Sequence, residues 1–304
     1  MKKIIVPTDF SGAALDALKV AADIAAKYKG VTIHLVHVFE KPVSGITLQF
    51  EVDMPKLREM KKFIFEKMED LCKSKFMKGI KTSIHVIADI EVWEFYKDKE
   101  LQGADLIVMG THGVKGNRTA FISSNTHKVL QTCSIPILTI KEYGGTFKMK
   151  NIIYASSFMD AEDADFDRIK PLINHFNSVV HLLKVNTRHN FDCTWSSKWA
   201  MEAFVKKHNL KNFTINTFND YTVEDGILHF ASADEIDMIV LETHGRTDFK
   251  QLFNPSVTQR IVNWIWKPVL SLLLSKDNSG EQSREFAEKR IVHAEEMYPG
   301  GLIV

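Results

Sequence analysis

Two periods of apolar residues alternate along the first half of the chain. Short runs such as "KIIVPTD" and "DLIVMG" have the length of strands, and the longer segments between them carry apolar residues every three or four positions. This pattern predicts five strands with four helices between them. We expect strands at residues 3–9, 31–39, 81–88, 104–110 and 135–141, and helices at residues 11–30, 53–71, 91–100 and 123–133. Because strands such as "DLIVMG" are apolar without interruption, they are typical of a parallel sheet covered by helices on both faces.

The same order of patterns returns in the second half. "KNIIYASSF" repeats "KKIIVPTDF", and "DMIVLETHG" repeats "DLIVMGTHG". The offsets are 148 (Ile152 minus Ile4), 147 (His181 minus His34) and then 132 twice (Asp237 minus Asp105, Pro268 minus Pro136). Since the order is kept over so long a period, we interpret the chain as a duplicated domain rather than a solenoid. We predict domains at residues 1–143 and 149–276, a glycine-containing linker between them, and a C-terminal extension at 277–304.

Composition narrows the class of protein. The chain has 304 residues, 45% of them hydrophobic, which suits two domain cores. A formal net charge of +1 predicts no nucleic-acid or membrane-surface partner, and three scattered cysteines fit a reducing compartment. The longest apolar tract, residues 261–274, is interrupted by Lys267 and Pro268 and is short for a membrane span. With no signal-peptide pattern at the start, we expect a soluble, cytoplasmic protein.

One loop occurs twice, and its two copies differ. The first reads "DLIVMGTHGVKGNRTAFISSN" (residues 105–125) and the second reads "DMIVLETHGRTDFKQLFNPSV" (residues 237–257). Each places an apolar strand before Thr-His-Gly and a serine near the start of a helix. In the first copy, glycines at the strand end and in the loop allow close approach to a ligand, and the helix start offers unpaired N–H donors to an anion. Since ligands of open parallel sheets lie beyond the carboxyl ends of the strands, we expect the first copy to face the same crevice as Asp9.

These residues together resemble the universal stress protein family in its tandem two-domain form. The resemblance covers about residues 1–275 and implies an α/β fold: two doubly wound, flavodoxin-like (adenine nucleotide alpha hydrolase-like) domains, each with a five-stranded, mainly parallel sheet. The nucleotide-binding branch of the family carries Gly, two residues, Gly, nine residues, Gly and then Ser or Thr. The first copy matches at Gly110, Gly113 and Ser124, but Ser123 replaces the third glycine.

The resemblance implies that the first domain binds ATP or another adenine nucleotide, with or without Mg²⁺. Phosphate is expected near Gly110, Gly113, Ser124 and Asn125, and adenine and ribose near Pro7, Thr8, Asp9 and Val38. The full candidate set is Pro7, Thr8, Asp9, Val38, Met109, Gly110, His112, Gly113, Ser123, Ser124 and Asn125. Ser123 would crowd the phosphates if that position needs a positive φ, and would add a donor if it has helical angles.

The second copy departs further from the family pattern. Glu242 stands where the first copy has Gly110, and we expect its charge to repel phosphate. Pro255 removes a backbone donor, and Ser157 stands where the first domain has Asp9. We therefore expect the second domain to be a degenerate partner that binds no nucleotide in the family manner.

Alternatives to nucleotide binding stay open. The leading one is a non-nucleotide scaffold or dimerisation protein, or a binder of another small ligand, motivated by Ser123 and Glu242. We expect no metal site, because no histidine pair has the spacing of a zinc helix. A hydrolase has little support, so ATP hydrolysis is expected to be weak at most. The family pairs through its last strands, which predicts pairing of the two domains within the chain and leaves open a homodimer.

Overall fold

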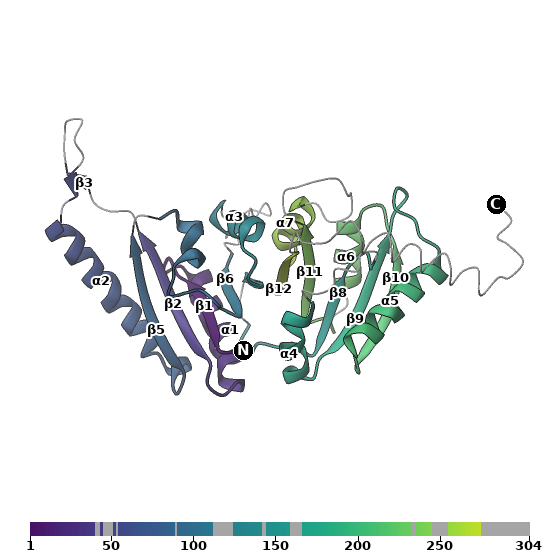
Figure 1. Ribbon diagram of the computed structural model, residues 1–304, viewed down its shortest axis with the longest axis horizontal. Helices are drawn as coiled ribbons and strands as arrows, with labels where there is room; N and C mark the ends of the chain where they lie inside the picture. The colour runs from purple at the N-terminus through teal and green to yellow at the C-terminus, as the bar shows by residue number, and fades with distance from the viewer. Residues whose placement is uncertain are drawn as a thin grey trace, which may run out of the picture.

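The fold is a single twisted sheet with helices on both faces (Figure 1). The computed structural model describes residues 1–39, 43–44, 51–52, 54–88, 90–111, 124–141, 144–158, 166–232, 235–244 and 255–274. The ten strands of this sheet lie in the order β10-β9-β8-β11-β12-β7-β6-β1-β2-β5. The N-terminal half, which we define as β1 to β7, and the C-terminal half, β8 to β12, each supply five neighbouring strands.

Within the N-terminal half, the five predicted strands are confirmed, and all of them run parallel. They are β1 (Lys3–Pro7), β2 (Thr32–Phe39), β5 (Lys81–Ala88), β6 (Leu106–Gly110) and β7 (Ile137–Ile140). The helices are α1 (Gly12–Lys27), α2 (Met54–Cys72) and α3 (Ser124–Thr132), with short 3₁₀ turns η1 (Lys75–Met77) and η2 (Val92–Lys97), and a small hairpin of β3 (Val43–Ser44) and β4 (Glu51–Val52). At residues 91–100, where we expected a helix, the structure has the shorter 3₁₀ helix η2.

The C-terminal half repeats this arrangement. Its elements are β8 (Asn151–Ala155), α4 (Phe166–Phe176), β9 (Val179–Asn186), α5 (Thr194–His208), β10 (Phe213–Asn219), α6 (Val223–Ala231), β11 (Met238–His244), α7 (Pro255–Trp264) and β12 (Val269–Leu274). The offset between the halves falls from 147 to 132 between the second and third strands, because residues 40–80 join β2 to β5 whereas the shorter segment 187–212 joins β9 to β10. The duplication read from the sequence is therefore visible in the order and direction of the strands.

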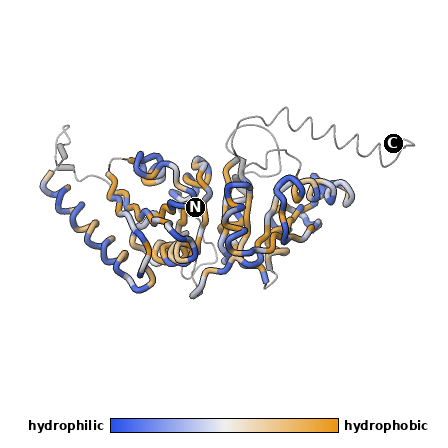
Figure 2. The backbone as a smooth tube through the Cα atoms, turned by 60° about the horizontal axis from the view of Figure 1, so that its bottom comes forward, coloured by the Kyte–Doolittle hydropathy of each residue, from blue (hydrophilic) through white to orange (hydrophobic). Residues whose placement is uncertain are grey.

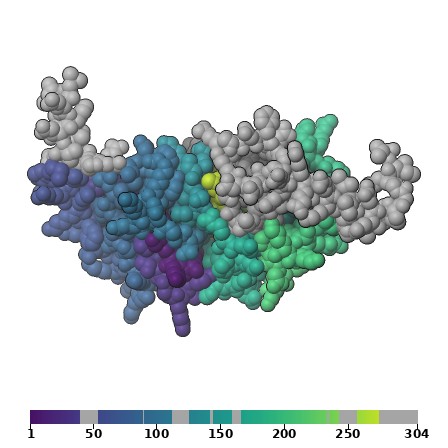
Figure 3. All heavy atoms as spheres, in the orientation of Figure 1, coloured from purple at the N-terminus to yellow at the C-terminus, as the bar shows by residue number. Residues whose placement is uncertain are grey.

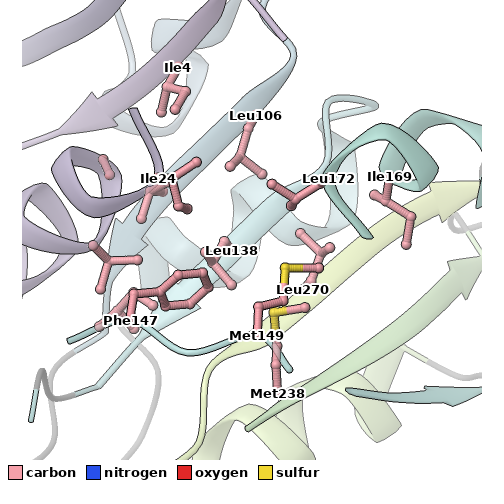
Figure 4. Close-up of a cluster of buried hydrophobic side chains, with 14 of the residues drawn as sticks. Ile4, Ile24, Leu106, Leu138, Phe147, Met149, Ile169, Leu172, Met238 and Leu270 are labelled. Carbon is pink, nitrogen blue, oxygen red and sulfur yellow. The ribbon is translucent and has the colours of Figure 1, made fainter. Parts of the chain in front are cut away.

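The two halves join through their last strands. β12 pairs antiparallel with β7, with Thr139 opposite Val269 and Leu138 opposite Leu270. One continuous cluster of buried apolar side chains crosses this join on the face that α1 and α4 cover (Figure 4). From the N-terminal half it includes Ile4, Ile24, Leu106 and Leu138, and from the C-terminal half Ile169, Leu172, Met238 and Leu270.

The segment expected to be a linker is packed rather than loose. Phe147 and Met149 are buried in the cluster that crosses the join, and the Phe147 N–H donates to the Asp23 carboxylate at 2.8 Å. On the same face, Tyr28 at the C-terminal cap of α1 donates to the carbonyl of Pro171 in α4 at 2.9 Å and stacks on His175. Figure 3 shows the two halves in direct contact along this junction.

Helix ends and exposed faces follow the sequence signals. The Ser11 hydroxyl caps α1 by accepting from the Ala14 N–H at 3.2 Å, and Gly30 beyond the helix has a φ of +83°. On α2, Leu57, Ile64 and Met68 face the core, while the outer side is polar (Figure 2). None of the described helices is long and apolar enough to cross a membrane.

Candidate functional site

The candidate site of the N-terminal half lies where the direction of strand order reverses. β1 has β2 on one side and β6 on the other, and all three strands run parallel. Their carboxyl ends therefore meet at one edge of the sheet, and open α/β sheets bind ligands at such switch points. The structure brings Pro7, Thr8, Asp9, Val38 and Gly110 to this edge, as the sequence predicted.

The loop after β1 is held in a fixed turn. The Thr8 N–H donates to the Val36 carbonyl at 2.8 Å, and the Thr8 hydroxyl accepts from the Phe10 N–H at 3.1 Å. Phe10 has a left-handed φ of 62°, which turns the chain into α1. One oxygen of the exposed Asp9 carboxylate accepts from the Ser11 N–H at 2.9 Å. The orientation of Asp9 is thus set before any ligand arrives.

The end of β2 forms the wall beside this loop. The ring of His37 bonds through Nδ1 to the Thr8 carbonyl at 2.7 Å and lies 4.9 Å from the ring of Phe10. Val38, the next residue, is partly buried against a second cluster of buried apolar side chains, which includes Ile5 and Val36. The backbone at the end of β2 is therefore tied to the loop that carries Asp9.

Gly110 is required by the packing of α1. A Cβ at this position would lie 2.3 Å from the carbonyl carbon and oxygen of Ala13 and 2.6 Å from the nitrogen of Ala14. Real Cβ atoms do not approach backbone so closely, so only glycine lets the first turn of α1 lie directly against the end of β6. Beyond it, the Thr111 N–H donates to the Ile140 carbonyl of β7 at 2.7 Å.

The remaining candidate residues divide into two groups. Met109 is buried, and Asn125 is partly buried in the first turn of α3, whose start is at Ser124. His112, Gly113 and Ser123 lie outside the described residues, as does the Ser124 side chain. The role of Ser123 therefore stays a prediction in both of its alternatives.

In the C-terminal half, Glu242 is buried on the face that α4 and α5 cover. It is 5% exposed, its carboxylate accepts from the Tyr154 hydroxyl, and its second oxygen accepts from the Ser156 hydroxyl at 3.1 Å. We expected this carboxylate to oppose phosphate, but the structure turns it toward hydroxyls of β8 and its following loop. The reason is geometric: a side chain at this strand end points to where Ala13 and Ala14 pack in the N-terminal half.

The loop after β8 keeps the turn of its counterpart. The Ser156 hydroxyl accepts from the Phe158 N–H at 3.2 Å, and Phe158 has a φ of 55°, so Ser156 and Phe158 repeat the roles of Thr8 and Phe10. Ser157, in the place of Asp9, lines a small recess that is partly open to solvent. Lys184 also lines the recess, and this buried cation is paired with Asp192 at 2.6 Å.

Sequence reasoning missed one cation near the candidate site. Lys141 follows β7, is half buried, and donates to the Asn263 carbonyl of α7, and its ammonium lies 5.3 Å from the ring centre of Trp266. Trp264 and Trp266, which precede β12, are 62% and 63% exposed. No sequence motif marks Lys141, because its neighbours come from the other half of the chain.

Among the described residues, no group of three or more His, Cys, Asp or Glu side chains could hold a metal ion. The histidines at the strands have other partners instead. His34 Nδ1 lies 2.9 Å from His85 Nε2, and His85 Nδ1 lies 3.1 Å from the Glu100 carboxylate. Burial, together with His85, Lys3 and Lys81, lowers the pKa of His34 to about 4.

These features define a tandem, doubly wound α/β protein whose N-terminal half has a switch point of strand order at β1. A sequence profile of the universal stress protein family matches residues 1–141 and 219–272. The chain belongs to the universal stress protein family.

Individual relatives agree with this assignment. The chain is 30% identical over 157 residues to a universal stress protein of Methanocaldococcus jannaschii, an alignment that covers 46% of this chain and 94% of the relative. A second universal stress protein of that organism is 27% identical over 143 residues, covering 46% of this chain and 82% of the relative. A solved universal stress protein from Archaeoglobus fulgidus has the same fold over 89% of this chain and 98% of its own, with a TM-score of 0.67 and 16% identity.

Proposed function

We propose that this stress-response protein binds one adenine nucleotide, such as ATP, in the crevice of its N-terminal half, and that its C-terminal half binds none in the same manner. The observation that carries the proposal is the contrast between Gly110, which leaves the strand end open to the backbone of α1, and Glu242, which fills the equivalent place. Family membership supports the stress-response role.

The described residues of the N-terminal crevice fit a nucleotide. The oriented carboxylate of Asp9 accepts hydrogen bonds, which suits a ribose or base donor. Gly110 lets the first turn of α1 lie against the end of β6. The helix α3 follows the loop after β6, and the N–H donors of its first turn are unpaired within the helix, which suits phosphate. Because the Asp9 carboxylate is oriented by the Ser11 N–H, we assign it to nucleotide recognition rather than to proton transfer. We therefore expect ATP hydrolysis to be slow. Any Mg²⁺ would arrive with the phosphates.

Isothermal titration with ATP tests this proposal. We expect one site per chain, and about tenfold weaker binding for Asp9→Ala because a charge-assisted hydrogen bond is lost. Ser157→Ala, at the equivalent position of the C-terminal half, is the matched control and should leave the titration unchanged. Absence of heat at millimolar ATP, with an intact circular dichroism spectrum, would remove the proposal in favour of the scaffold alternative. Two equal sites per chain would contradict the assignment of the C-terminal half.

A further inference from the structure

Lys141 lies one strand away from Gly110. Ile140 and Gly110 are in register across β7 and β6, and Lys141 is the next residue along β7. The Thr111 N–H bonds to the Ile140 carbonyl at 2.7 Å, so the backbone of this strand end is joined to the start of the loop that leads to α3. A lysine side chain is long enough to reach across one neighbouring strand.

The C-terminal half holds this lysine in place. Its ammonium donates to the Asn263 carbonyl in the last turn of α7, and it lies 5.3 Å from the centre of the Trp266 ring. A cation at a helix C-terminus and over an aromatic face is favourable, and these contacts alone would make Lys141 a helix cap. Figure 3 shows yellow atoms from the C-terminal end of the described chain at the surface of this junction, beside teal atoms of the N-terminal half.

The contact with α7 does not use all the hydrogen-bond donors of the Lys141 ammonium. An ammonium has three N–H donors, and one of them serves Asn263. Burial lowers the pKa of Lys141, and no carboxylate among the described residues lies within ion-pair distance to offset that burial. A half-buried cation of this kind gains from an anionic partner.

The pseudo-equivalent positions of the C-terminal half lack the same features. At the offset of 132, Lys141 corresponds to Leu273, Gly110 to Glu242, and Trp266 of the C-terminal half to Ser134 of the N-terminal half. The lysine therefore accompanies the glycine of β6, and leucine accompanies the buried acid of β11. This pattern is what an anion site restricted to one half would require.

We propose that Lys141, held by Asn263 and Trp266, completes the nucleotide site of the N-terminal half by pairing with the phosphate chain. The inference rests on the proposed function, and it gives the C-terminal half a role: this half supplies the contacts that position a phosphate-binding residue. The two halves then form one composite site, because neither holds all of its parts.

Titrations of the full chain with ATP and with adenosine test the inference. We expect Lys141→Met to weaken ATP binding about tenfold or more and to leave adenosine binding unchanged, because only ATP carries phosphate. Lys141→Arg keeps the charge and should restore most of the ATP affinity. Trp266→Ala should weaken ATP binding by a smaller factor, since the lysine remains but loses its aromatic support.

Lys267→Met is the matched control, because that ammonium donates to the Ile236 carbonyl within the C-terminal half at 2.6 Å. It should change neither titration. If the wild type binds ATP and Lys141→Met binds it equally well, the inference is wrong while the proposed function stands. Equal losses for ATP and adenosine would show that Lys141 only supports the structure, which also contradicts the inference. If the wild type binds neither ligand, both proposals fall together.

Discussion

At the end of β6 the N-terminal half has Gly110, and at the equivalent position of β11, two residues before that strand ends, the C-terminal half has Glu242. The strands around the two positions pair in the same order and direction, so the backbones are alike. The two positions differ in what packs against the strand. At Gly110 it is the backbone of α1, whereas at position 242 it is the glutamate's own carboxylate, which accepts hydrogen bonds from two hydroxyls. The comparison teaches that a duplicated domain can keep its sheet while a single side chain changes what packs against one of its strands.

In the C-terminal half, hydrogen bonds compensate for the burial of the Glu242 carboxylate. A buried carboxylate is costly unless hydrogen bonds satisfy it, and Tyr154 and Ser156 supply these bonds from β8 and the loop after it. The equivalent positions of the N-terminal half, at the offset of 148, are Val6 and Thr8. Val6 has no hydroxyl, so the network belongs to the C-terminal half alone.

The largest effect is expected at Gly110. Gly110→Ala would place a methyl group 2.3 Å from the Ala13 backbone, and the shift of α1 that relieves this contact should lower the free energy of unfolding by about 3 kcal/mol. Urea denaturation measures the loss. Gly12→Ala is the control, since its added Cβ meets nothing within 4 Å and alanine is the better helix former. If both variants are equally stable, the close approach of α1 to β6 is wrong.

A smaller loss is expected at Glu242. Glu242→Ala leaves the fully buried Tyr154 hydroxyl without its carboxylate partner, which should cost about 2 kcal/mol of stability. Adding Tyr154→Phe to Glu242→Ala removes both of these partners and should recover part of that loss. A double-mutant cycle by chemical denaturation gives the coupling energy. Additive losses would show that the two groups do not interact as described.

The smallest expected effect is on the pH dependence of the free energy of unfolding. Because the folded pKa of His34 is about 4, below its ordinary value of 6.5, the unfolded chain binds a proton that the folded chain does not. Stability from this group is present above pH 6.5 and is lost as the pH falls toward 4. His34→Gln should flatten the pH dependence of unfolding across that window. His181→Gln should flatten it less, because Glu235 opposes the lowering of the His181 pKa by burial.

An increase of stability on acidification through this window would contradict the environment of His34. His34 and His181 occupy equivalent positions of the repeat, at an offset of 147 (181 minus 34). Their two variants therefore compare the pH dependence that each half contributes. Equal responses would show that His85 and the lysines near His34 do not affect its charge state.

The strands could be predicted from the sequence, and so could the placement of Asp9 and Gly110, which both belong to the N-terminal half, at the same edge of the sheet. Apolar runs and ordered offsets located β1, β6 and their counterparts, because a buried parallel strand needs an unbroken apolar run. Asp9 and Gly110 were placed together because parallel strands end at one edge. The segment around Phe147 connects the two halves, but its two glycines gave no sign that the aromatic residue after them is buried.

Contacts between the halves could not be predicted. The neighbours of Lys141 depend on the antiparallel pairing of β7 with β12 and on where α7 ends, and neither leaves a spacing in the sequence. The direction of the Glu242 side chain depends on the pleat of β11 and on the hydroxyl of Tyr154. Such information lies in tertiary packing, where residues distant in the chain determine the surroundings of a single side chain.

The central claim is that the N-terminal crevice receives the nucleotide and the C-terminal crevice does not. A crystal structure of the full chain grown with excess ATP measures this directly. We expect density for one nucleotide per chain, between Asp9 and the start of α3, with the Glu242 carboxylate still bound to Tyr154 and Ser156. A nucleotide seated beside Ser157 in the C-terminal half, with the crevice at Asp9 empty, would contradict the account.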